Sequence, residues 1–187
     1  VVFMYDYVII HGSYGTPFEN WFKWLFEKLS EEGKSVLAPQ FPCGDVQNYS
    51  NWAKVMNAYK GYIGKETSFV GHSLAPAFIT DYILDNSLQV KNLYFVAPFY
   101  GLINIPEFDK VNKPFFIYKD MKRINNLAKS ATCFISKNDP YVPNQLSEEF
   151  ADYIGAKKIF VENAGHFNIA AGYTKFEALL EEMIKNG

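Results

Sequence analysis

Arginine and cysteine are scarce in this sequence, and each shortage disfavours a class of site. Arg123 is the single arginine among 18 basic residues, so a phosphate site built from paired guanidinium groups is not expected. The net charge is −2, and neither sign of charge forms a long run. Because nucleic-acid-binding proteins usually carry a basic patch, the sequence predicts no nucleic-acid partner.

The two cysteines, Cys43 and Cys133, lie far apart and form no C-x-x-C motif. That usage is typical of buried free thiols in a reducing compartment, and it predicts a cytoplasmic protein. Long hydrophobic runs are missing as well, so no membrane span is expected. The apolar N-terminal stretch contains Asp6 and lacks a basic segment before it, which favours a buried strand over a signal peptide.

Hydrophobic residues, by contrast, are plentiful. They make up 49% of the 187 residues, and aromatic side chains alone account for 18%. A chain of this length has room for one domain with a substantial core, so residues 1–187 are predicted to form a single domain. Aromatic side chains in this number can fill that core and also line an apolar pocket.

Strand and helix patterns alternate along the whole chain. Short apolar runs predict strands at Tyr5–Ile10, Ser35–Ala38, Thr67–Gly71, Leu93–Ala97, Ala131–Ser136 and Lys158–Glu162. Helical spacing predicts helices from Pro17 to near Gly33, and at Tyr49–Tyr62, Leu74–Leu84, Met121–Ala128, Asn144–Ile154 and Thr174–Lys185. A capping-box pattern of Thr16 and Glu19 marks the start of the first helix. Together these elements predict an α/β fold, a mostly parallel six-stranded sheet with helices on both faces.

A G-x-S-x-A motif, Gly71-His72-Ser73-Leu74-Ala75, follows the third predicted strand. It is a variant of the G-x-S-x-G nucleophile elbow, in which a sharp strand-to-helix turn exposes a serine above the sheet. Small residues flank the serine because neighbouring backbone passes close to it. Ser73 is therefore the candidate nucleophile, and its alternative role is to cap the following helix.

A serine hydroxyl needs a general base, and the sequence has three histidines. His166 follows the last predicted strand, in a loop from which an imidazole can reach back over the sheet. His11 and His72 are interpreted as packed structural histidines. Asp139 follows the fifth predicted strand and is the candidate that orients the base, with an Asp-Pro turn as its alternative role. Ser73, Asp139 and His166 also occur in the chain order that the elbow pattern predicts.

An oxyanion hole needs two backbone N–H donors aimed at the developing negative charge. Leu74, directly after the candidate nucleophile, is predicted to supply one of them. The segment from His11 to Gly15 is predicted to supply the other, from Ser13 or alternatively from Tyr14. A plain glycine-containing turn is the simpler interpretation of this segment. A phosphate loop is not expected, because the G-K-[ST] ending is missing.

Four segments of the chain, taken in order, resemble one family. They are His11-Gly12-Ser13, Gly71-His72-Ser73-Leu74, Asn138-Asp139-Pro140 with Val142-Pro143, and Ala164-Gly165-His166-Phe167-Asn168. They are similar to the small serine hydrolases typified by retinoblastoma-binding protein nine and bacterial YdeN. The resemblance implies an α/β-hydrolase fold with a minimal cap and a Ser-Asp-His triad. Two departures stand out: Ala75-Pro76 replaces the usual Gly-containing pair, and the L-x-C-x-E segment is absent, so no retinoblastoma-type partner is expected.

The sequence thus predicts a serine hydrolase that cleaves small carboxylic esters, thioesters or activated amides through an acyl-enzyme on Ser73. The alternative is a non-catalytic interaction protein on the same scaffold. The predicted chemistry needs no metal and no organic cofactor, and the oligomeric state is left open.

Aromatic residues beside the predicted strand ends are the candidate pocket walls, with core packing as their alternative role: Tyr14, Phe99, Tyr100, Tyr141 and Phe167. Trp21 and Trp52 keep helical spacing and are predicted to be core. A cap could come only from residues 98–128, which are predicted to hold at most one short helix. That leaves little to cover a long substrate, so short acyl groups are expected.

Overall fold

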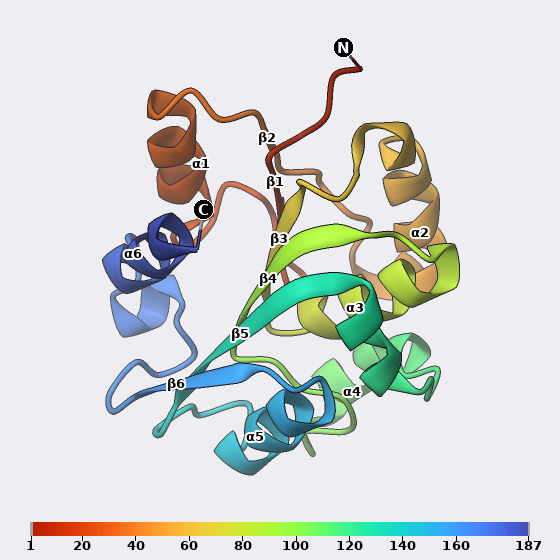
Figure 1. Cartoon of the computed structure of the whole chain (residues 1–187). Helices are drawn as coiled ribbons and strands as arrows, with labels where there is room; N and C mark the ends of the chain where they lie inside the picture. Colours follow the sequence, from red (N-terminus) through yellow and green to blue (C-terminus); the bar gives the residue numbers. More distant parts are fainter. Residues whose placement is uncertain (1, 187) are drawn as a thin grey trace.

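The computed structural model describes residues 2–186. Six strands form one sheet in the order β2-β1-β3-β4-β5-β6, and every neighbouring pair is parallel (Figure 1). The strands are β1 (Tyr7–Ile10), β2 (Val36–Leu37), β3 (Ser68–His72), β4 (Val90–Val96), β5 (Ala128–Ser136) and β6 (Lys157–Val161). The predicted parallel sheet is therefore confirmed. Within residues 2–186, every helix is too short or too polar to cross a bilayer.

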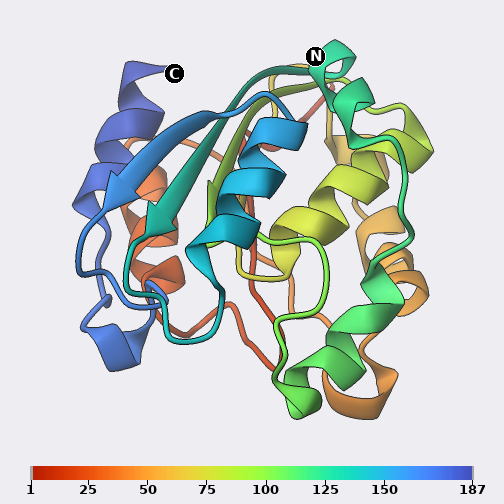
Figure 2. The same ribbon diagram turned by 90° about the horizontal axis from the view of Figure 1, so that it is seen from below.

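Helices cover both faces of the sheet (Figures 1 and 2). One face carries α1 (Phe22–Glu31) and α6 (Glu177–Lys185), and the other carries α2 (Tyr49–Asn57), α3 (Ala75–Asn86) and α5 (Asn144–Tyr153). Side chains along β1 alternate between the two resulting cores, with Val8 and Ile10 in one and Tyr7 and Ile9 in the other. Because β1 is buried on both faces, its sequence is a continuous apolar run.

The first helix begins later than the sequence pattern predicts. α1 starts at Phe22, and residues 17–21 form turns and a bend, so Thr16 and Glu19 do not cap this helix. Asn20 has a φ of 51°, in the left-handed region, so a right-handed helix cannot run through it. The segment that was expected to begin a helix therefore becomes a loop at the end of the sheet.

Residues 98–128 hold more structure than expected. Pro106 occupies the first position of α4 (Pro106–Asn112), where its fixed φ and missing N–H favour a helix start rather than a break. Two 3₁₀ helices follow, at Lys113–Phe115 and Met121–Asn126, and the second lies where a short helix was predicted at Met121–Ala128. Figure 2 shows α4 on the side of the sheet where the strands end, so it lies over the region predicted to carry the active site.

The two edges of the sheet are built differently from its centre. β2 has only two residues. β6 carries Lys157 and Lys158, which pair with Glu182 at 2.7 Å and with Asp152 at 2.6 Å, respectively. The longest strands, β4 and β5, thus lie inside the sheet, where both neighbours are other strands.

Candidate active site

Ser73 lies on a sharp turn between β3 and α3. Its φ is 64°, a left-handed conformation that a residue with a side chain adopts only under constraint. A Cβ on Gly71 would lie 2.6 Å from Ile79 Cδ1 and 3.2 Å from the Pro76 nitrogen, so the turn requires glycine there. The predicted elbow geometry follows from this close approach of the strand and the helix.

Gly12, in the loop after β1, likewise allows a close approach of two backbone segments. A Cβ at this position would lie 3.0 Å from Ser73 Cβ and 3.2 Å from the carbonyl oxygen of His72. The backbone of this loop can therefore come close to the Ser73 hydroxyl.

A chain of hydrogen bonds joins the three side chains predicted to act together. His166 Nε2 lies 3.0 Å from Ser73 Oγ, and His166 Nδ1 lies 2.7 Å from Asp139 Oδ2. The other oxygen of Asp139 accepts the backbone N–H groups of Tyr141 at 2.9 Å and Val142 at 3.0 Å. The Asp139 side chain is 3% exposed. With Nδ1–H donating to the carboxylate, Nε2 is left to accept a proton from the serine.

Two buried side chains hold the loop that carries His166. His72 donates its Nε2–H to the His166 carbonyl at 2.7 Å, and Trp21 donates its indole N–H to the Phe167 carbonyl at 2.9 Å. Burial is the main reason that the pKa of His72 is lowered to about 3, and a charge on His166 acts in the same direction. His72 is therefore neutral at physiological pH and serves as a fixed donor.

His11 is also a packed histidine. Its Nδ1–H donates to the Gly12 carbonyl at 2.8 Å, and its Nε2 accepts the Phe41 N–H at 2.9 Å. Burial lowers the pKa of His11. With both ring nitrogens engaged, His11 positions the loop after β1 and has no free nitrogen for a proton transfer.

Two backbone N–H groups are available beside Ser73. Within residues 2–186, neither the Leu74 nor the Ser13 N–H donates to a protein acceptor. The Tyr14 N–H, in contrast, donates to Gln47 Oε1 at 3.0 Å. Of the two alternatives for the second oxyanion donor, Ser13 is thus the one whose N–H is free. Its side chain donates to Asn112 Oδ1, which joins the loop to α4.

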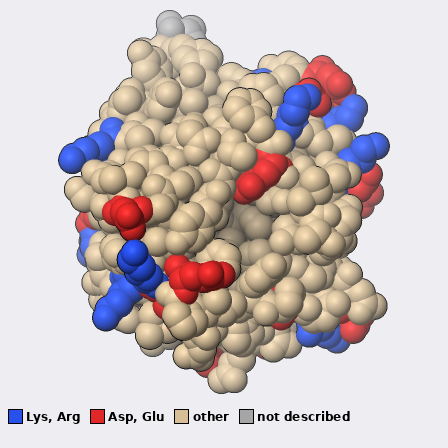
Figure 3. Space-filling model, turned by 180° about the vertical axis from the view of Figure 1, so that it is seen from behind, with Lys and Arg blue, Asp and Glu red and all other residues tan. Residues whose placement is uncertain are grey.

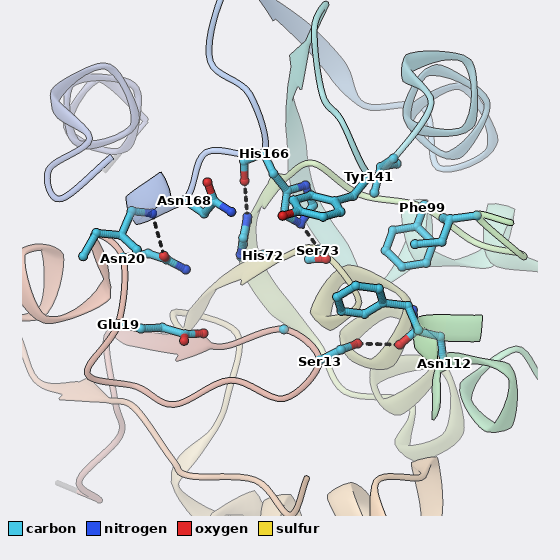
Figure 4. Close-up of a pocket in the computed structure, with 15 residues that line it drawn as sticks. Ser13, Glu19, Asn20, His72, Ser73, Phe99, Asn112, Tyr141, His166 and Asn168 are labelled. Carbon is cyan, nitrogen blue, oxygen red and sulfur yellow. Dashed lines mark hydrogen bonds between the residues drawn. The ribbon is translucent and has the colours of Figure 1, made fainter. Parts of the chain in front are cut away.

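Ser73 opens into a cavity of about 240 Å³. Figure 4 shows Phe99 and Tyr141 on one side of the serine, and Glu19, Asn20 and Asn168 on the other. The first side, called here the apolar half, is formed by Phe99, Ile103, Phe108, Tyr141 and Val142. The second, the polar half, is formed by Glu19, Asn20, His72 and Asn168, and it also includes the apolar side chain of Ile169. In Figure 3, a hollow opens on this face of the molecule, with acidic side chains at its margin.

Two of the five predicted wall residues, Phe99 and Tyr141, line the cavity. Tyr14 is not among the lining residues, but its ring packs edge-on against that of Phe108, with 5.9 Å between the ring centroids. Tyr100 instead points toward α3, where its hydroxyl donates to Asp81 Oδ2 at 2.9 Å. Phe167 has a φ of 49°, which turns its side chain away from the cavity into the core under α6.

Sequence reasoning missed several lining residues. Ile103 and Phe108 come from the segment around α4, which was expected to be irregular. Glu19 and Asn20 were assigned to a helix start, and only the left-handed backbone at Asn20 reveals the loop that turns them inward. Asn168 belongs to the motif around His166, and its position two residues after His166 was the only sequence signal that it could line the cavity.

The side chains that could bind a metal ion are not clustered in the described residues. In the part of the chain that the structure describes, no group of three or more His, Cys, Asp or Glu side chains is arranged to hold a metal ion.

Cys133 is buried and Cys43 is half-buried, and the two form no disulfide. The expectation of two buried thiols is therefore correct for Cys133 and wrong for Cys43, which lies beside the loop after β1.

Comparison with known proteins gives consistent matches. Residues 7–185 match the model of a family described as serine hydrolase. YdeN of Bacillus subtilis (strain 168), a protein named as a hydrolase, is 27% identical over 169 residues, which cover 89% of this chain and 87% of YdeN. The crystal structure of the B. subtilis ydeN gene product matches with a TM-score of 0.87 and 23% identity, over 98% of both chains. Est1E from Butyrivibrio proteoclasticus, with ferulic acid bound, matches with a TM-score of 0.72 and 16% identity, over 98% of this chain and 90% of that one.

Proposed function

Because this chain belongs to the serine hydrolase family and has an α/β-hydrolase fold, we propose that it cleaves small carboxylic esters, thioesters or activated amides through an acyl-enzyme on Ser73. Membership of the family makes it a hydrolase, and the proposal adds the residues and the substrate class. The observation that carries it is the hydrogen-bonded chain from Asp139 through His166 to Ser73, at 2.7 and 3.0 Å. Those lengths suit proton transfer in the order Ser to His.

In the proposed reaction, Ser73 Oγ attacks the acyl carbon while His166 Nε2 takes its proton. Asp139 holds the imidazole in the required tautomer and stabilises the imidazolium that forms. The N–H groups of Ser13 and Leu74 stabilise the oxyanion of the tetrahedral intermediate. His166 then returns the proton to the leaving oxygen, sulfur or nitrogen. A water molecule repeats the same steps on the acyl-enzyme and releases the acid and Ser73.

The cavity limits the size of the acyl group. Its volume is about 240 Å³, and its apolar half is lined by Phe108 on α4 and by Tyr141. Each methylene that such a pocket accepts contributes roughly 1 kcal/mol, which is about tenfold or less in kcat/KM per step. Acetyl to butyryl esters are therefore expected to be cleaved with a higher kcat/KM than decanoyl esters. Rates that climb through decanoyl esters would mean that the acyl chain leaves the cavity along an open groove.

In this proposal the protein binds a small-molecule acyl substrate, and it binds neither a nucleic acid nor a membrane. Cytoplasmic localisation is also part of the proposal, and the free thiols of Cys43 and Cys133 suit a reducing compartment.

The proposal is tested with a fluorophosphonate probe, which reacts covalently with activated serines. The wild type should be labelled and should hydrolyse the short esters, and Ser73→Ala should lose both properties. Ser30→Ala, which removes an exposed hydroxyl on α1, is the matched control and should behave as the wild type. Labelling that survives in Ser73→Ala would show that another residue is the nucleophile. A wild type that is neither labelled nor active would favour a non-catalytic interaction protein.

A further inference from the structure

The polar half of the cavity contains a carboxyl group that the proposed reaction does not use. Glu19 lines the cavity and is half-buried, and Figure 4 shows its side chain directed inward, on the side of the site that carries Asn20 and lies opposite Phe99. The carboxyl group packs against the loop after β1, because a Cβ on Gly15 would lie 2.6 Å from Glu19 Oε1. The loop that replaces the expected helix start therefore delivers an acid to the active-site wall.

Glu19 has no cation beside it. Within residues 2–186, no lysine, arginine or histidine lies at ion-pair distance from its carboxyl group, and the cavity lining contains neither lysine nor arginine. Burial raises the pKa of Glu19, and a hydrogen bond from the Thr16 backbone only partly opposes that effect. A half-buried carboxylate without a cation is costly, so a ligand that supplies positive charge would be favoured there.

The neighbours of Glu19 leave it as the acceptor of the polar half. Asn20 Oδ1 accepts the Ile169 N–H at 2.9 Å, and Asn168 Oδ1 accepts the Ala171 N–H at 3.1 Å. Both amide carbonyls are thus used to fix the short 3₁₀ helix after His166. The Nε2–H of His72 is committed to the His166 carbonyl. Glu19 is also the one carboxyl group among the described residues of the cavity lining, so a cationic donor that enters this half finds its strongest acceptor there.

We propose that Glu19 is a specificity-determining residue, which selects substrates whose leaving group carries a protonated amine. This inference rests on the proposed function. The two parts of an ester lie on opposite sides of its carbonyl carbon, so an acyl chain in the apolar half directs the leaving group into the polar half. An alkyl leaving group would cover the Glu19 carboxylate without pairing it, and an anionic one would be repelled. An ammonium N–H donates to it and balances its charge.

The test uses two esters of the same shape, 2-(dimethylamino)ethyl butyrate and 3-methylbutyl butyrate, at a pH where the amine is protonated. The measured quantity is the ratio of their kcat/KM values. Passing from the wild type to Glu19→Gln should lower that ratio by roughly tenfold, the effect of losing a hydrogen bond to a charged group. Comparing the ratio between variants cancels the difference in intrinsic reactivity of the two esters. Glu66→Gln makes the same charge change before β3, at the opposite end of the sheet, and should leave the ratio unchanged.

A second measurement needs only the wild type. The two product alcohols, 2-(dimethylamino)ethanol and 3-methylbutanol, are compared as competitive inhibitors, and the amino alcohol should inhibit at a concentration about tenfold lower. Equal ratios in the wild type and Glu19→Gln, or equal inhibition by the two alcohols, would overturn the assignment of Glu19 while leaving the esterase proposal standing. If the wild type cleaves neither ester faster than Ser73→Ala does, the proposed function fails, and this inference fails with it.

Discussion

Two buried carboxylates, Asp139 and Asp81, differ in what surrounds them. The side chain of Asp139 is 3% exposed and Asp81 is fully buried. Asp139 receives three hydrogen bonds, from two backbone N–H groups and from His166. Asp81 receives one, from the Tyr100 hydroxyl at 2.9 Å, and within the described residues its Oδ1 has no partner.

The cause of the difference lies in the backbone. Asp139 is in a loop, where neighbouring N–H groups are free to turn toward the carboxylate. Asp81 is in the middle of α3, where the backbone N–H groups are used by the helix itself. Burial consequently raises the pKa of Asp81 to about 6, and the Tyr100 hydrogen bond and the charge of Lys119 oppose this only partly. The loop therefore supplies donors to both oxygens of the Asp139 carboxylate, and the helix leaves one oxygen of Asp81 without a donor.

The comparison is tested most strongly by changing each carboxylate to its amide. Asp139→Asn should lower kcat by roughly 10³- to 10⁴-fold, because the amide cannot stabilise the imidazolium or fix the tautomer of His166. Asp81→Asn should leave kcat within about twofold of the wild type. Steady-state kinetics on a butyryl ester measures both, and circular dichroism checks that the variants are folded. Similar losses in the two variants would mean that Asp81 also contributes to the site.

The second-largest expected effect is on the pH dependence of the free energy of unfolding, to which Asp81 contributes through its raised pKa. The pKa of Asp81 is about 6 in the folded protein and 3.8 in an ordinary environment, so its contribution to stability is complete below about pH 4 and lost by about pH 6. The free energy of unfolding of Asp81→Asn, minus that of the wild type, should therefore rise by roughly 2 to 3 kcal/mol between pH 4 and pH 7. Urea titrations at each pH measure it.

Taking the difference between variant and wild type removes the contributions of His11 and His72. Their lowered pKa values change stability in the opposite direction, and equally in both proteins. A difference that stays constant from pH 4 to pH 7 would mean that Asp81 ionises as readily as an exposed carboxyl group.

The smallest expected effect concerns the single donor to Asp81. Tyr100→Phe should destabilise the protein by about 1.5 to 3 kcal/mol above pH 6, where Asp81 is ionised, and by less at pH 4, where it is protonated. Tyr82→Phe removes a hydrogen bond of 2.9 Å to the neutral side chain of Asn57 and is the matched control. Its cost should be about 1 kcal/mol and should not depend on pH in this range. Equal pH profiles for the two variants would contradict the comparison.

The sequence allowed prediction of the features that depend on local pattern. The six strands, the turn at Ser73 and the positions of Asp139 and His166 after their strands could be predicted, because each is encoded within a few residues. The apolar spacing likewise placed Trp21 and Trp52, both of which are fully buried. The catalytic roles assigned to these positions remain proposals.

Features that depend on distant contacts could not be predicted. The capping-box pattern of Thr16 and Glu19 was locally sound, yet the left-handed Asn20 places its side-chain Oδ1 against the Ile169 N–H, on a segment about 150 residues away. Tyr100 was expected in the active site because it follows a strand, but its hydroxyl is taken by Asp81 on α3. The apolar residues on both sides of Asp81 indicate a buried helix, but they do not identify Tyr100 as the partner of its carboxyl group.

The short and lysine-bearing edges of the sheet bear on how this protein behaves at high concentration. An exposed strand offers unpaired N–H and C=O groups to any other chain, and long apolar edges promote aggregation. β2 offers only two residues, and the lysines of β6 would be brought face to face if two copies paired edge to edge. The sheet is therefore protected from growing across molecules. Substituting both Lys157 and Lys158 with valine or threonine would be a direct way to make it self-associate.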